Sequence, residues 1–122
     1  MKPALFQYHR PHSVEEAIAL LRQFGDDAKI LAGGQSLIPL LNLRLARPKH
    51  LIDINRISEL SYIRVEDDSL LIGALTRHDE AGQSSDVREY CPLLAEAIPY
   101  IGHVAIRSRG TIGGSIAHAD PA

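Results

Sequence analysis

Two glycine-rich turns organise this sequence: Ala32-Gly33-Gly34-Gln35-Ser36 and Gly110-Thr111-Ile112-Gly113-Gly114-Ser115. Each turn precedes a segment that can form a helix. Adjacent glycines lack Cβ atoms, so consecutive backbone N–H groups can converge on one point, and a hydroxyl side chain at the rim adds a donor. Such a concave arrangement suits a phosphate or pyrophosphate. Two such turns in one short chain predict a dinucleotide held from two sides.

The same residues admit a purely structural interpretation. Paired glycines are common at tight turns and helix boundaries, and Ser36 can cap a helix instead of donating to a phosphate. The first turn lacks the Gly-x-Gly-x-x-Gly order of a dinucleotide fold, and neither turn is followed by the Gly-Lys-Ser/Thr of a P-loop. Ile38 stands where a hydrolase nucleophile elbow requires glycine. We therefore expect neither nucleotide hydrolysis nor a serine nucleophile.

Composition narrows the class of protein. The chain has 122 residues, of which 45% are hydrophobic and 23% charged, which predicts a globular domain with a core. A net charge of −2 without a long basic run argues against nucleic acid, and no apolar stretch approaches the roughly 20 residues that span a bilayer. The N-terminus lacks a signal-peptide pattern, so we expect a cytoplasmic location. Cys91 stands alone, which excludes an internal disulfide or a cysteine-held cluster.

The first part of the chain predicts a small α/β unit. Residues 6–8 are extended, and Ser13 with Glu16 forms a capping signal for a helix that Gly25 ends. A buried strand is expected at 28–32. A short helix capped by Ser36 and a second core strand at 51–54 complete a β–loop–α–β unit over residues 27–54.

The second part of the chain mixes strands and helices without strict alternation, which predicts an α+β arrangement. Residues 63–66 and 70–74 form a hairpin around Asp67-Asp68. Thr76, followed by two acidic residues, opens a helix. A further helix covers residues 93–101, Gly102 ends it, and residues 103–109 are irregular. The chain stops directly after the second glycine turn, so we expect it to be a fragment of a longer polypeptide.

Two sets of polar residues near the second turn are weaker candidates for ligand binding. His118 and Asp120 on the edge of a strand could provide partial metal ligands with His103 or His78, but a third clustered ligand is missing, and polar loop residues are the simpler interpretation. Arg107 and Arg109 flank the turn and either steady a diphosphate or form a solvated charged surface.

The two glycine turns also carry a resemblance to a known family. Residues 32–41 and residues 111–122, Thr-Ile-Gly-Gly-Ser-Ile-Ala-His-Ala-Asp-Pro-Ala, resemble the two flavin-loop signatures of the FAD-binding subunit of molybdenum hydroxylases. This family includes the medium subunit of aerobic carbon monoxide dehydrogenase and the flavin domain of xanthine dehydrogenase. The resemblance continues through residues 6–8, 51–55 and 72–76.

The resemblance implies a PCMH-type FAD-binding fold of the α+β class. A small N-terminal α/β subdomain would cover residues 1–55, and residues 56–122 would begin a larger α+β subdomain that is truncated here. Because the family's chains are longer, the resemblance agrees with a fragment.

The resemblance also implies a cofactor site. Residues 32–36 would contact the pyrophosphate and the adjoining ribityl region. Residues 111–115 would contact the cofactor from the opposite side. The turn at 101–102 and residue 117 would pack against the cofactor. The residues expected at the cofactor are Ala32, Gly33, Gly34, Gln35, Ser36, Ile101, Gly102, Gly110, Thr111, Gly113, Gly114, Ser115, Ala117 and Asp120. We assign no acid–base residue and no metal ligand.

The implied function is electron transfer. Family members pass electrons from a molybdopterin-binding large subunit, through 2Fe–2S clusters on a small subunit, to FAD and on to an external acceptor, in a heterohexamer built as a dimer of heterotrimers. FAD would be the only cofactor on this chain. Two alternatives stay open: a nucleotide-binding module of another kind, and a non-catalytic interaction domain whose glycines are structural.

Overall fold

The computed structural model describes residues 1–120. The chain forms two compact units, Met1–Ser58 and a second unit that begins at Glu59, and each is described by itself. Whether these units are two FAD-binding subdomains stays a prediction. Within the described residues, no helix has the length and apolar character that crossing a membrane requires.

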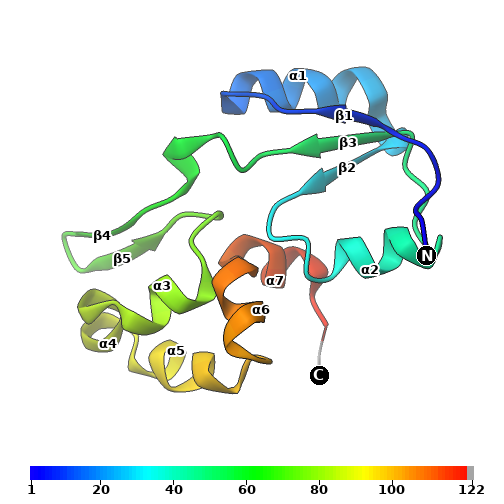
Figure 1. Ribbon diagram of the computed structural model, residues 1–122. Coiled ribbons are helices and arrows are strands. Elements are labelled where there is room, and N and C mark those ends of the chain that lie inside the picture. The colour runs from blue at the N-terminus through cyan, green and yellow to red at the C-terminus, as the bar shows by residue number, and fades with distance from the viewer. Residues whose placement is uncertain (121–122) are drawn as a thin grey trace. The chain divides into compact units, whose positions relative to one another are not determined.

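The first unit contains a parallel three-stranded sheet. Its strands are β1 (Gln7–His9), β2 (Ala28–Leu31) and β3 (His50–Asp53), in the order β1-β3-β2 (Figure 1). β3 lies in the centre, and its Leu51 and Ile52 are buried, so the predicted core strand is confirmed. The predicted burial of β2 is wrong in large part, because this edge strand leaves Ile30 44% exposed.

Helix α1 (Val14–Phe24) begins and ends where the sequence predicts. The Ser13 hydroxyl accepts a hydrogen bond from the Glu16 N–H at 3.1 Å, and Gly25 follows the helix at φ 53°. The Glu16 carboxylate reaches back one residue further than expected and accepts from the His12 N–H at 2.7 Å. The Phe24 ring stacks on His50 of β3 with 3.5 Å between ring centroids, which fixes α1 on the sheet. A 3-10 turn, η1 (Gly25–Asp27), leads into β2.

Helix α2 (Leu37–Asn42) connects β2 to β3 and confirms the β–loop–α–β unit. Its buried Leu41 anchors it in the first unit. The predicted capping role of Ser36 is wrong: Ser36 itself has helical angles, φ −96° and ψ −40°, and its side chain makes no capping hydrogen bond. A capping residue needs an extended backbone to turn its oxygen toward the following N–H groups. The Ser36 hydroxyl is therefore exposed at the entrance of α2.

The second unit begins with the short turn η2 (Ser58–Leu60), whose first residue belongs to the preceding unit, and continues into a hairpin. β4 (Ile63–Glu66) and β5 (Ser69–Ile72) pair antiparallel, which confirms the predicted hairpin, and Asp67 at its turn has φ 54°. A Cβ at Gly73 would lie 2.2 Å from the Leu60 carbonyl oxygen, so only glycine permits this close passage after β5.

Short helices complete the second unit and pack around a core of Ala81, Val87 and Ile98. The elements are α3 (His78–Gln83), α4 (Ser85–Tyr90), α5 (Pro92–Ala97), η3 (Ile98–Tyr100), α6 (Val104–Arg109) and α7 (Ile112–His118). α4 packs against the hairpin, and α3 lies beside α4, α5 and α6 (Figure 1). The mixture confirms the α+β class.

Several helix boundaries differ from the sequence prediction. Thr76 is not a cap: its hydroxyl donates to the Tyr62 carbonyl at 2.9 Å, and α3 begins two residues later. The helix expected over 93–101 divides at Pro99, which has no N–H for an α-helical bond, so the chain tightens into η3. Residues 103–109 were expected to be irregular, but Val104–Arg109 form α6. No side-chain capping bond marks the start of this helix.

Candidate functional site

The first glycine turn provides a set of unused backbone donors. It leaves the end of β2 and enters α2, and Gly34 has φ 78°, in the left-handed region. Among the described residues, the N–H groups of residues 33–36 have no backbone acceptor. Orphan N–H groups ahead of a helix suit an anion. Oxyanion binding by this turn stays a prediction, and these N–H groups are the donors that it would use.

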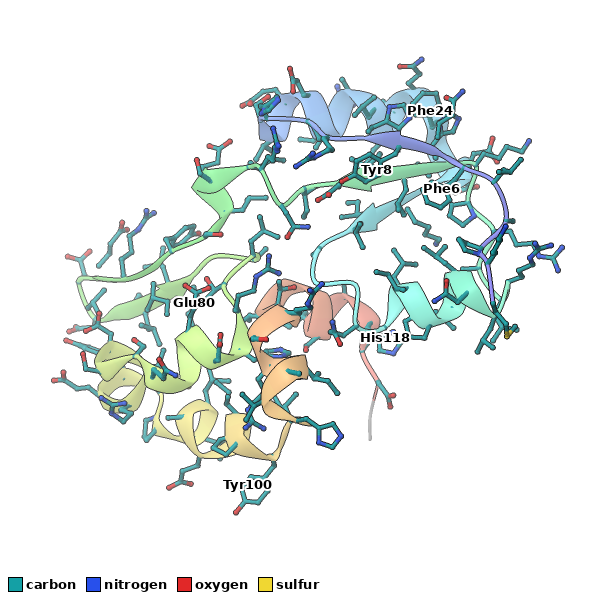
Figure 2. The ribbon with its side chains drawn as sticks, viewed as in Figure 1. Phe6, Tyr8, Phe24, Glu80, Tyr100 and His118 are labelled. Atoms are coloured by element: carbon teal, nitrogen blue, oxygen red, sulfur yellow. The ribbon has the colours of Figure 1, made fainter. Side chains whose placement is uncertain are left out.

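A polar network holds this turn in place from the neighbouring strand. Asn55 follows β3, and its side-chain amide donates to the Ala32 carbonyl at 2.8 Å and to the Asp53 carboxylate at 2.7 Å. The Asn55 N–H also donates to Asp53, at 2.9 Å. The Tyr8 hydroxyl, from β1 (Figure 2), donates to the second oxygen of Asp53. All three sheet strands thus fix the carbonyl at the entrance of the turn.

The charge state of Asp53 follows from this network. Burial by itself raises the pKa of the carboxyl, but hydrogen bonds from Tyr8 and Asn55 outweigh it, and the pKa of Asp53 lies below its ordinary value. Burial and the neighbouring carboxylate raise the pKa of Tyr8. Asp53 is therefore ionised at neutral pH and Tyr8 is a neutral donor.

The second glycine motif has a different construction from the first. Thr111 is the N-cap of α7, and its hydroxyl accepts from the Gly114 N–H at 3.0 Å. The Ile112 N–H donates to the Thr76 carbonyl, the Gly113 N–H to the Ala74 carbonyl, and the Ser115 N–H to the Thr111 carbonyl, at 2.9, 2.9 and 3.1 Å. The open nest predicted here is wrong, because partners inside the second unit already occupy these donors.

Close packing explains two of the glycines in this motif. A Cβ at Gly113 would lie 2.8 Å from the Ala74 carbonyl oxygen, and a Cβ at Gly110 would lie 2.7 Å from Nδ1 of His78. Gly113 thus lets the first turn of α7 approach the chain after β5, and Gly110 makes room for an imidazole ring.

The side chain of His78, the first residue of α3, contacts the second glycine motif. Its side chain is buried, with 4% exposed, and its Nε2 lies 2.9 Å from the Ser115 hydroxyl. Burial lowers the pKa of His78, against smaller opposing contributions from the Thr111 backbone and the Asp79 charge. The ring is therefore neutral at neutral pH. The Ser115 hydroxyl lies within hydrogen-bond distance of this buried titratable side chain.

The turn at Ile101 and Gly102 is clamped by Arg107. Nη1 of Arg107 donates to the carbonyls of Pro99, Ile101 and Gly102 at 3.1, 3.3 and 3.0 Å. Gly102 has φ 51°, which favours glycine. The Arg107 guanidinium is thus engaged in holding a candidate cofactor segment, which favours an internal role for it over diphosphate binding.

The remaining predicted residues lie near the end of α7. Ala117 is exposed on that helix, and Asp120 follows it. His118 (Figure 2) ends the helix, so the expectation that His118 and Asp120 share a strand edge is wrong; His118 Nε2 lies 4.0 Å from the Asp120 carboxylate. In residues 1–120, no group of three potential metal ligands comes together. Residues 121–122 of the family motif lie outside the described residues.

Sequence reasoning missed the residues that support the two motifs. Asp53 and Asn55 lie at the carboxyl end of β3, and the sequence predicts that this strand neighbours β2, which leads into the first turn. Their position at the carboxyl end of a neighbouring strand was therefore a signal that could have identified them. Tyr8 and His78 gave no such signal, since nothing in the sequence pairs them with Asp53 and Ser115.

Comparison with known proteins places the chain among flavoproteins. Residues 4–122 match the family described as the FAD binding domain in molybdopterin dehydrogenase. The chain is 55% identical over 122 residues to 6-hydroxypseudooxynicotine dehydrogenase complex subunit alpha of Paenarthrobacter nicotinovorans, and the match covers 100% of this chain and 41% of that protein. It is 54% identical to the carbon monoxide dehydrogenase medium chain of Hydrogenophaga pseudoflava, over 99% of this chain and 42% of that protein.

A solved structure agrees with these matches. The structure of carbon monoxide dehydrogenase from Hydrogenophaga pseudoflava aligns with a TM-score of 0.97 at 55% identity, over 99% of this chain and 42% of that one. The chain thus spans about two fifths of the length of these relatives. The predicted family resemblance and the predicted α+β flavoprotein fold are confirmed.

Proposed function

Because the chain belongs to the family of FAD binding domains in molybdopterin dehydrogenases, we propose that it is part of a subunit that passes electrons from 2Fe–2S clusters through FAD to an external acceptor. Hydride and electron transfer are the chemistry that a bound flavin supplies. The residues of this chain bind the nucleotide and orient it. No acid–base role is assigned to any of them.

The set of unused donors in the first glycine turn carries this proposal. The N–H groups of residues 33–36 would bind the FAD pyrophosphate, since N–H groups that have no backbone acceptor ahead of a helix favour an anion. The Ser36 side chain, which caps nothing, is available as a further donor. Asn55 and Asp53 keep the entrance of the turn fixed, so little order has to be gained when the nucleotide binds.

The second motif would contribute its exposed side chains and not its N–H groups. Ser115 and Ala117 are exposed on α7 and would contact the cofactor directly. Thr111, Gly110, Gly113 and Gly114 would act as the backbone framework that holds α7. Ile101 and Gly102, held by Arg107, would pack against the nucleotide, and Asp120 would lie at the edge of the site.

The partners follow from the proposed electron path. The clusters and the molybdenum cofactor would reside on a small and a large subunit, as the family resemblance implies. The full-length protein would assemble with both as a dimer of heterotrimers in the cytoplasm.

Flavin content of the full-length protein tests the proposal. The full-length chain, purified alone or with its partners, is expected to show the visible absorption of flavin and to release FAD on acid denaturation. A folded full-length protein that stays colourless after incubation with FAD would contradict the proposal. Release of a colourless nucleotide, such as NAD, would support the nucleotide-binding alternative instead.

A further inference from the structure

The buried imidazole of His78 packs against the second glycine motif. The His78 N–H donates to the Gly110 carbonyl at 2.9 Å, and the missing side chain of Gly110 leaves space for the ring. The ring Nε2 lies 2.9 Å from the Ser115 hydroxyl oxygen. Among the described residues, Nδ1 is buried and has no hydrogen-bond partner of ordinary geometry. His78 is thus a buried polar group with one engaged nitrogen and one unsatisfied nitrogen.

The unequal surroundings of the two nitrogens locate the proton of the neutral ring. A neutral imidazole has one N–H donor and one acceptor nitrogen. Buried N–H groups without an acceptor are rarer in proteins than buried acceptors without a donor. The Thr111 backbone also faces the ring, but Nδ1 makes no hydrogen bond among the described residues. We therefore place the proton on Nε2, where the Ser115 oxygen can accept it, and the lone pair on Nδ1.

This arrangement determines what the Ser115 hydroxyl can do. A hydroxyl has one hydrogen to donate and two lone pairs to accept with. If Nε2–H occupies a lone pair, the hydroxyl hydrogen is left free to turn toward the exposed side of α7. An acceptor-rich ligand, such as a phosphate or a carbonyl oxygen, would then receive this hydrogen bond.

We propose that His78 is a positioning residue: by donating from Nε2 to the Ser115 oxygen, it makes Ser115 a donor toward the phosphate or carbonyl oxygens of the bound flavin nucleotide. This inference rests on the proposed function. His78 itself does not contact the ligand, and its effect passes through Ser115 alone.

A double-mutant cycle on the full-length apoprotein tests this role. FAD affinity is measured by quenching of flavin fluorescence for wild type, His78→Leu, Ser115→Ala and the double variant. His78→Leu is expected to weaken FAD binding about tenfold, the effect of losing one oriented hydrogen bond. In the Ser115→Ala background the same substitution should change affinity less than about twofold, because coupled residues are not additive. His78→Gln, whose amide can still donate, should stay within about threefold of wild type.

The control separates orientation from loss of packing. Val87→Ala removes volume from the core of the same unit without touching Ser115, and its FAD affinity should equal that of wild type. Equal weakening by His78→Leu in both backgrounds, or weakening by Val87→Ala similar to that by His78→Leu, would overturn the inference. Wild type that binds no FAD would instead refute the proposed function, so the two failures are distinguishable.

A spectroscopic measurement covers the case in which His78→Leu does not fold. In wild-type protein with 15N-labelled histidine, the ring signal lost in His78→Gln is assigned to His78. The expected spectrum is that of a neutral ring protonated at Nε2. A ring protonated at Nδ1, or a charged ring at neutral pH, would overturn the inference.

Discussion

Replacing Gly34 by valine tests the first glycine turn most directly. Gly34 has φ 78°, and a Cβ there would lie 2.8 Å from Cδ1 of Ile38. The Ile38 contact involves the end of a flexible side chain and is relieved at small cost. The backbone conformation is the larger effect, because a β-branched residue at positive φ costs about 1–3 kcal/mol. We expect Gly34→Val to lower the free energy of unfolding by this amount and to weaken FAD binding by about 10- to 100-fold, since the added side chain also blocks the N–H donors.

Gly25→Val is the matched control in the same unit. Gly25 also has positive φ, 53°, but a Cβ there meets nothing within 4 Å, and it follows α1 away from the turn in sequence. Urea unfolding of the full-length apoproteins should show similar losses of stability for both variants. FAD titration should show weak binding only for Gly34→Val. A folded Gly34→Val protein with wild-type affinity, or equal weakening by Gly25→Val, would refute the reasoning.

Four further outcomes are expected in the full-length protein. Asn55→Ala should weaken FAD binding about three- to tenfold in a fluorescence titration, because it frees the carbonyl at the entrance of the first turn; unchanged affinity would contradict the anchoring role. The pKa of Asp53 is lowered in the folded state, so ionised Asp53 stabilises the first unit at pH values above its ordinary pKa of 3.8. This stabilisation is lost as the pH falls through the lower pKa of the folded state. Acid unfolding of Asp53→Asn should therefore lack this component, and the stability difference from wild type should shrink below that pH. Gly113→Ala should destabilise the second unit by about 1–3 kcal/mol in urea, since its Cβ would lie 2.8 Å from the main-chain oxygen of Ala74; a neutral effect would show that α7 can move away. His118→Ala in the reconstituted complex should leave anaerobic reduction of the iron–sulfur clusters by substrate unchanged, and a hundredfold slower reduction would place this chain in the substrate chemistry.

Features that depend on neighbours in sequence were predictable from the residues themselves. Ser13 caps α1 and Gly25 ends it because a cap and a positive φ are local properties. The β–loop–α–β unit and the hairpin follow from apolar periodicity and turn residues within short windows. The boundary at Pro99 was missed although proline is a local helix-breaking signal. The start of α6 was missed because no side-chain cap marks it.

The chemistry of the two glycine motifs was decided by tertiary structure. In sequence both motifs have paired glycines and a following hydroxyl, and both predict open N–H donors. Within residues 1–120, the N–H groups of residues 33–36 in the first motif have no backbone acceptor. In the second motif, the carbonyls of Ala74 and Thr76 and the oxygens of Thr111 accept the N–H groups of residues 112–115. The sequence by itself determined that the glycines permit a close approach. Which group makes that approach depends on where the rest of the chain places its carbonyls and side chains, because a hydrogen bond requires a partner in space and not a neighbour in sequence.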